Sequence, residues 1–130
     1  MSTINAQNYG DGTDSVPASA VLQGTAKAWV NFNGTGTVAI RESFNVASLT
    51  DLGTGRYSFS RSNAFSNSNY SSTFGVIRQD NSSTESSGNM SFQSLSSYQA
   101  SSMRVSVYDN DTNAYRDAVM VNVVSSGDLA

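Results

Sequence analysis

The chain has 130 residues, a mass of 13.8 kDa and a formal net charge of −3 at pH 7. It contains no histidine and no cysteine, which excludes disulfide frameworks, thiolate metal sites and every mechanism that needs an imidazole or a thiol. Because its pI is about 4.5, it lacks the positive field with which proteins bind nucleic acid or anionic membranes. One domain is expected at this length.

Most of the polar residues carry no charge. Charged residues make up 13% of the chain, against about a quarter in ordinary domains, and 25 of the 130 residues are serine. This composition is common in extracellular fibres and viral appendages. The sequence shows neither a signal peptide nor a run of about 20 apolar residues, so we expect no membrane insertion.

Residues 1–23 are polar and rich in turn residues, with Gly10-Asp11-Gly12 followed by Pro17, the only proline. Their apolar residues are too sparse for an independent core. We therefore predict an extended N-terminal attachment arm that packs on a partner or on its own domain, with a flexible tail as the alternative. Residues 24–130 are expected to form one β module.

Alternation of apolar and polar residues with a period of two dominates the rest of the chain and predicts β-strands. The first strand places Val30 and Phe32 on one face and Trp29 on the other. Glycine-rich turns at 33–36 and 51–55 follow, because glycine accepts positive φ at little cost. The predicted strands are Thr25–Phe32, Thr37–Glu42, Arg56–Arg61, Asn69–Ile77, Met90–Leu95, Met103–Tyr108 and Ala118–Val124.

The last two strands are expected to form a hairpin with Asp109–Asn113 as its turn. The serine-rich residues 79–101 predict a long loop around the short strand at Met90–Leu95. Short strands with a turn signal every ~10 residues are typical of β-sandwiches and barrels. We therefore predict an all-β fold, an antiparallel β-sandwich of short strands, and leave open whether it closes into a barrel.

The carboxylates are scattered along the chain. A glycosidase would need two of them to converge in the fold. No local motif surrounds any of them, and the two glycine-rich turns lack the helix start or Lys-Ser/Thr ending of a phosphate loop. We expect a protein that is not an enzyme and holds no cofactor. The carboxylates concerned are Glu42, Asp51, Asp80, Glu85, Asp109, Asp111 and Asp117.

The sharpest local motif is the acidic run that starts at Asp109. Asp109, Asp111 and Asn113 carry oxygen ligands at alternate positions and resemble the start of a calcium-binding loop. The run departs from that loop at its sixth position, where Ala114 replaces the glycine, and at its twelfth, where Met120 replaces the bidentate glutamate. The favoured interpretation is a polar turn without metal, and calcium binding is the alternative.

Four aromatic residues are candidates for contacts with other molecules. Tyr98, Tyr108 and Tyr115 combine an apolar ring with a polar hydroxyl, which suits stacking on a sugar. Trp29 stands on a face that is otherwise polar, so it either packs on a second layer or lies in a subunit contact. An ordinary place in the core is the alternative for each of them.

The segment from Gly24 to Asp51, GTAKAWVNFNGTGTVAIRESFNVASLTD, resembles a module of tail-fibre and other appendage proteins of tailed bacteriophages, marine and cyanobacterial phages among them. The turn at 53–57, the pair Asn69-Tyr70 and the strands around Arg104 and 121–123 also match that module. These stretches span nearly all of residues 24–124, and the part at 60–101 diverges most. The resemblance implies a β-rich, trimeric structure at the virion surface and carries no catalytic residues.

Three functions are compatible with these features. The first is a short tail fibre or knob-like appendage that takes part in recognition of a host-surface glycan or protein. The second is a capsid or tail decoration (cement) protein that contacts only other virion proteins, and the third is a carbohydrate-active enzyme. The tail fibre is the favoured prediction. It implies a homotrimer at the virion surface, with baseplate, tail or capsid proteins as partners and no nucleic acid among its ligands.

Overall fold

Two antiparallel sheets form most of the molecule, as the alternating pattern predicts. The computed structural model describes residues 5–77, 89–91, 97–110 and 112–130. The four-stranded sheet consists of β3 (Ala28–Asn33), β4 (Ala39–Phe44), β7 (Ser71–Ile77) and β11 (Met120–Ser126). The five-stranded sheet consists of β5 (Ser48–Asp51), β6 (Arg56–Ser60), β8 (Asn89–Ser91), β9 (Ser102–Asp109) and β10 (Ala114–Tyr115).

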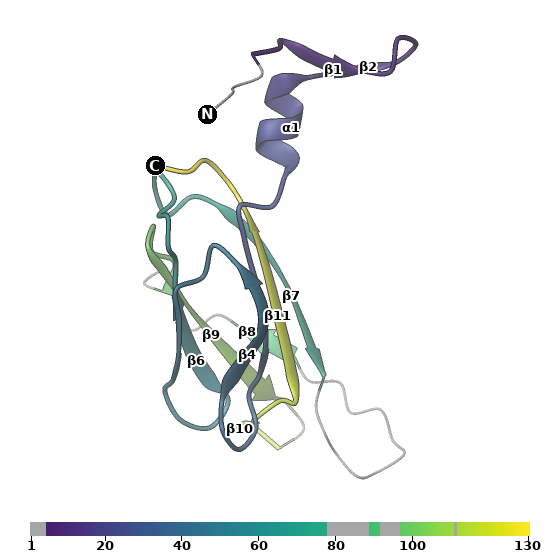
Figure 1. Cartoon of the computed structure of the whole chain (residues 1–130). Helices are drawn as coiled ribbons and strands as arrows, with labels where there is room; N and C mark the ends of the chain where they lie inside the picture. The colour runs from purple at the N-terminus through teal and green to yellow at the C-terminus, as the bar shows by residue number, and fades with distance from the viewer. Residues whose placement is uncertain (1–4, 78–88, 92–96, 111) are drawn as a thin grey trace.

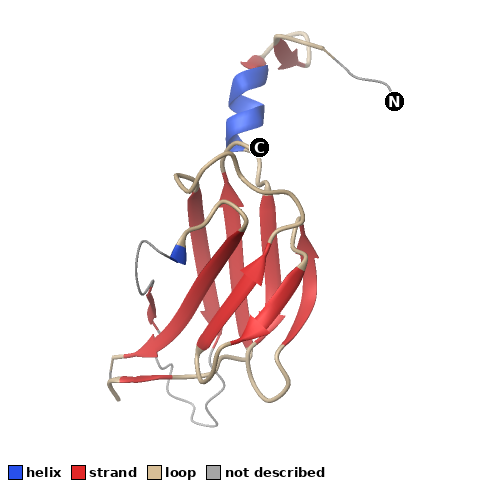
Figure 2. Cartoon of the chain, turned by 90° about the vertical axis from the view of Figure 1, so that its left-hand side faces the viewer, coloured by secondary structure: helices blue, strands red, loops and turns tan. Residues whose placement is uncertain are grey.

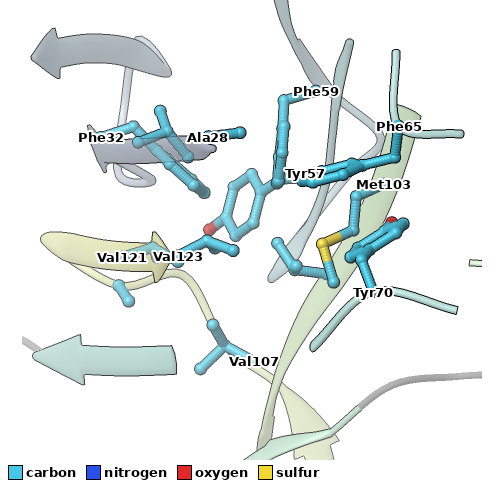
Figure 3. Close-up of a cluster of buried hydrophobic side chains, with 13 residues drawn as sticks. Ala28, Phe32, Tyr57, Phe59, Phe65, Tyr70, Met103, Val107, Val121 and Val123 are labelled. Atoms are coloured by element: carbon cyan, nitrogen blue, oxygen red, sulfur yellow. The ribbon is translucent and has the colours of Figure 1, made fainter. Parts of the chain in front are cut away.

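The two sheets lie one over the other and share a single core (Figure 2). One sheet has the order β4-β3-β11-β7, and the other has the order β10-β9-β6-β5 with β8 also paired to β9. Figure 3 shows side chains from both sheets meeting between them. The ring of Phe32 from β3 packs edge-on against Tyr57 from β6, with centroids 5.0 Å apart. Open sheets packed in this way are consistent with the predicted β-sandwich.

The predicted faces of β3 and β11 are confirmed, whereas Ile40 of β4, expected to face inward, is exposed. Val30 and Phe32 of β3 are buried, and the residues between them are only half-buried. Val121 and Val123 of β11 are buried in the same way. Each such side chain contributes about 1.5–3 kcal/mol when it leaves water, so period-two burial fixes which face of each strand turns inward. The strand predicted at Met90–Leu95 overlaps β8, which is Asn89–Ser91. Residues 92–96 lie outside the described residues.

The predicted hairpin between Met103–Tyr108 and Ala118–Val124 is wrong. The turn after β9 leads into the two-residue strand β10, which pairs with β9. β11 lies in the other sheet, between β3 and β7. The chain crosses between the layers at Asp117 and Ala118. There the Asp117 carboxylate accepts a hydrogen bond from the backbone N–H of Gly55, and the Ala118 carbonyl accepts one from Gly34. These bonds end the hairpin early.

The N-terminal arm has regular structure where an extended segment was expected. β1 (Asn8–Gly10) and β2 (Ser15–Pro17) form a small hairpin, and α1 (Ala18–Gly24) follows directly. The helix starts after Pro17, whose φ of −59° suits a helix entry, and it contains the good helix formers alanine, leucine and glutamine. Figures 1 and 2 show α1 and the hairpin projecting from the end of the sandwich at which the chain terminates.

Candidate functional site

Tyr108 and Tyr115, two of the three tyrosines predicted to bind a ligand, lie side by side on the five-stranded sheet. They are direct cross-strand partners on β9 and β10, and such partners project from the same face of a sheet. Their half-buried rings meet edge to face with centroids 5.2 Å apart. The Tyr108 hydroxyl donates a hydrogen bond to Asn113 Oδ1 at 2.6 Å. These contacts hold the pair in one orientation.

The same face carries two arginines. Alternation turns Arg56 of β6 and Arg104 of β9 away from the core, and both are exposed. The register sets Arg56 opposite Ser106 and Arg104 opposite Ser58, so the arginines are diagonal neighbours with Cα atoms about 7–8 Å apart. The Arg56 guanidinium also lies over the ring of Tyr115, 5.6 Å from its centroid. Within the described part of the chain, neither arginine has a carboxylate ion-pair partner.

A pocket of about 110 Å³ opens between these arginines. Its walls include the almost fully buried Ser97 and Ser106, 3% and 2% exposed. A second hollow adjoins it and shares Ser97 and Arg104. Guanidinium and hydroxyl groups are hydrogen-bond donors, so the pocket suits a small, negatively charged group rich in acceptors. The complete lining of the first pocket is Leu52, Arg56, Tyr57, Ser97, Arg104, Val105 and Ser106.

Tyr98, the third predicted tyrosine, does not join this pair. It is bridged to Met103, at the opposite end of β9 from Tyr108. Its ring packs against Tyr70 with centroids 5.1 Å apart, and burial raises the pKa of its hydroxyl. Because this ring packs against the buried cluster, Tyr98 supports the core, which was the alternative interpretation for the aromatic residues.

A buried arginine to which no sequence motif pointed lies near Tyr98. Arg61 is 6% exposed, and its Nη1 donates hydrogen bonds to the carbonyls of Gln99 and Ser102 at 2.9 and 3.1 Å. Its guanidinium lies over the rings of Tyr70 and Phe65, 4.3 and 4.7 Å from their centroids. The faces of the Tyr70 and Phe65 rings are therefore covered by the Arg61 guanidinium. The hydrogen bonds from Arg61 hold the segment that precedes β9 in place.

Asp117, one of the scattered carboxylates, stabilises the fold through hydrogen bonds. Its Oδ1 accepts hydrogen bonds from the Gly55 N–H at 2.7 Å and from the Tyr57 hydroxyl at 3.3 Å. The same hydroxyl donates to the Gly34 carbonyl at 2.9 Å. Burial, together with the negative charge of Asp117, raises the pKa of Tyr57 well above its ordinary value. Asp117 thus joins the turns of both sheets.

The acidic run contains the residues of the alternative calcium site. The Asp109 carboxylate is almost fully buried and forms an ion pair with Arg116, with Oδ2 3.6 Å from Nε. Asn113 accepts the bond from Tyr108, and its φ of 53° closes the turn. Asp111 lies outside the described residues. No group of three or more acidic side chains able to hold a metal ion occurs among the residues that the structure describes.

Of the remaining carboxylates, Asp51 lies near enough to Tyr57 to help raise the pKa of that residue, as Asp117 does, whereas Glu42 lies in the other sheet. Glu42 is exposed on β4 in the four-stranded sheet. Asp51, at the end of β5 in the other sheet, accepts a hydrogen bond from the Gly53 N–H at 2.8 Å, which orders the turn. Asp80 and Glu85 lie outside the described residues.

Trp29 lies on the outer face of the four-stranded sheet, away from the core. It is half-buried and pairs with Phe44 of β4 on one side and Val124 of β11 on the other. Phe44 is 55% exposed and Val124 41% exposed, so an apolar row crosses three strands of this face. In the next row Asn31 donates a hydrogen bond to Asn122. We call Phe44, Trp29 and Val124 the outer apolar row.

The arm exposes a second set of apolar side chains. Tyr9 and Val16 are cross-strand partners in its hairpin, and both are exposed. Leu22 of α1 is 61% exposed, and no residue of the helix is buried. The helix is tied to the sandwich by a hydrogen bond from Gln23 to Asp128. Within the described ranges no helix has the length and apolar character that crossing a bilayer requires.

No family model, curated protein or solved structure matches the chain. The resemblance to phage appendage proteins stays a prediction from the sequence motifs.

The arginines of the candidate site were missed by sequence reasoning. Arg56 precedes the alternating pair Tyr57 and Phe59, and Arg104 stands between the apolar Met103 and Val105. The alternation was sufficient to place each of them on an outer face. Only the pairing of β6 with β9 brings them to one pocket, and no local pattern encodes that pairing.

Proposed function

We propose that this chain is a non-catalytic virion protein of a tailed bacteriophage, a short tail fibre or knob-like appendage that takes part in recognition of the host surface. The arm attaches the protein to another virion protein. The outer face of the five-stranded sheet, with Tyr108, Tyr115 and Arg56, is the recognition surface.

One observation carries this proposal. Figure 1 places β10, which contains Tyr115, at the end of the sandwich opposite the projecting arm. The arm displays apolar side chains at one end, and the ordered aromatic pair lies at the other. A protein that is attached to a particle at one end and binds a surface with the other needs its attachment site and its binding site at opposite ends. The resemblance of residues 24–51 to phage appendages, given above, points to the same function.

A decoration or cement protein is the second candidate. The exposed apolar residues of the arm favour it, because attachment to the virion is then the whole function. Under this alternative the tyrosine pair has no ligand.

The outer apolar row supports the proposed homotrimer. Aromatic residues are enriched in the centres of protein interfaces, and Trp29 is flanked there by two exposed apolar neighbours. Three copies around one axis multiply weak contacts with a surface by avidity.

Binding measurements separate these functions. Purified full-length protein should attach to host cells or their envelope polysaccharide, and Tyr115→Ala should weaken this attachment while Tyr9→Ala, in the arm, should not. Binding only to virions stripped of this protein would identify a decoration protein. Turnover of a polysaccharide that one carboxylate variant abolishes would identify an enzyme instead.

A further inference from the structure

We infer that the pocket between Arg56 and Arg104 binds the carboxylate of an acidic sugar, so that the ligand is a saccharide containing hexuronate or a similar sugar acid. This inference rests on the proposed function and names its ligand class. It begins with charge. The chain is acidic and has only 7 lysines and arginines, yet two of these arginines line one pocket of about 110 Å³.

The two cations repel each other in the unliganded protein. They are diagonal neighbours on paired strands, and the described residues give neither of them an ion-pair partner. Arg61 and Arg116, in contrast, are engaged by backbone carbonyls and by Asp109. An anion bound between Arg56 and Arg104 removes this repulsion and forms charge-assisted hydrogen bonds with both of them.

The pocket between the arginines measures about 110 Å³, enough for a small group such as one carboxylate beside the two guanidinium groups. The adjoining hollow, which shares Ser97 and Arg104 and measures about 370 Å³, leaves room for the rest of the ligand. A planar carboxylate also matches the fork of donors on a guanidinium.

The neighbouring aromatic pair favours a sugar as the carrier of the carboxylate. Arg56 lines the pocket and also lies over the ring of Tyr115, so the two features are contiguous. Tyr115 in turn packs against Tyr108. A pyranose ring has an apolar face of C–H groups that stacks on such rings, and its hydroxyls bond to polar tips such as the Tyr108 hydroxyl. A carboxylate clamp beside an aromatic surface is complementary to an acidic pyranose.

Titration calorimetry of the full-length protein tests the inference with three probes: a galacturonic acid trisaccharide, the neutral galactose trisaccharide and inorganic phosphate. We expect the acidic trisaccharide to bind most tightly, phosphate at least about tenfold more weakly because it lacks the sugar ring, and the neutral trisaccharide not to bind. Arg56→Gln and Arg104→Gln should each weaken its binding by about tenfold or more, since each removes charge-assisted hydrogen bonds. Arg41→Gln, an exposed arginine on the other sheet, is the matched control and should change binding by less than about twofold.

Several outcomes would overturn the inference. If the neutral trisaccharide binds as tightly as the acidic one, the carboxylate is not recognised. If phosphate binds as tightly as the acidic trisaccharide, the sugar ring is not recognised. If both pocket variants still bind the acidic trisaccharide, and circular dichroism shows intact β structure, the ligand binds at a different site. Failure of the proposed function is distinct from these. If the protein binds the acidic trisaccharide through both arginines but is absent from virions, the inference stands and the proposed function is wrong. If it attaches to host cells but does not bind the trisaccharide, the proposed function stands and the inference is wrong.

Discussion

Arg61 illustrates how a single buried charge stabilises this fold. Its guanidinium lies over aromatic rings, and its Nη1 donates to backbone carbonyls at and just before the start of β9, whereas its buried Nε has no hydrogen-bond partner among the described residues. Arg61→Met should lower the free energy of unfolding by about 3 kcal/mol, because those carbonyls lose charged donors. Urea denaturation measures the change. Arg41→Met, on an exposed strand, serves as control, and equal midpoints for the two variants would contradict the role of Arg61.

Two glycines distinguish the free-energy cost of a positive φ from the cost of a steric clash with a new Cβ atom. Gly36 and Gly55 both have positive φ, 59° and 63°. An added Cβ meets no atom within 4 Å at Gly36, but at Gly55 it lies 2.6 Å from the Arg116 carbonyl oxygen. Gly36→Ala should therefore cost about 1 kcal/mol and Gly55→Ala clearly more. Thermal unfolding of both variants provides the comparison, and a larger loss at Gly36 would contradict the close approach of the Arg116 backbone to Gly55.

Tyr57 links stability to alkaline pH. Its pKa is raised in the folded protein, mainly by burial. The unfolded chain therefore loses its phenolic proton first, and the free energy of unfolding should fall as the pH rises above about 10, the ordinary tyrosine pKa. Tyr57→Phe should cost about 1 kcal/mol at neutral pH, through its lost hydrogen bonds, and should flatten the alkaline decline. Parallel pH slopes for both proteins would disprove this linkage.

Single residues were predictable from the sequence where burial alone decides their place. Val30, Phe32 and Val121 face the core as alternation requires. Contacts that depend on the exact strand register or on long-range pairing were not predictable. The contact between Tyr108 and Tyr115 needs the β9–β10 register, and the cage around Arg61 brings together segments nearly 40 residues apart in sequence, with Gln99 38 positions away.

At the level of elements, the positions of the predicted strands and the two hairpins around the glycine-rich turns followed the sequence, whereas the hairpin between β9 and β11 did not. β9 and β11 both alternate well, and a polar turn follows β9, so a hairpin was the natural prediction. The structure instead sends β11 to the other sheet, because the bonds at Asp117 and Ala118 belong to turns that lie far away in the sequence. Short helices are similarly hard to predict. α1 has seven residues, and no buried face gives it a period of 3.6.

The arm should be separable from the sandwich. It buries none of its helical residues, and the bond between Gln23 and Asp128 is solvent-exposed. A chain that lacks residues 1–23 should unfold with a free energy within about 1 kcal/mol of the full-length value. The same truncation should no longer enter virions, since the exposed apolar residues of the arm would make that attachment. Incorporation of the truncated chain would contradict the role of the arm.

At the level of the whole molecule, we propose different roles for the two outer faces of the sandwich. The face with the outer apolar row is proposed to bury each subunit against its neighbours. Sedimentation equilibrium should give three times the chain mass of 13.8 kDa for the natural protein. Replacing both Trp29 and Phe44 by serine should give a single chain with unchanged β-sheet circular dichroism, because neither side chain belongs to the core between the sheets. A natural protein that sediments as one chain would refute the trimer.

The most direct measurement is the position of this chain on the particles of a phage whose genome encodes it. Electron microscopy with antibodies against the full-length protein, together with mass spectrometry of purified particles, provides that position. We predict label at the tail or capsid surface, with the end that carries Tyr115 pointing away from the particle. Purified infectious particles that contain none of the chain would contradict the account.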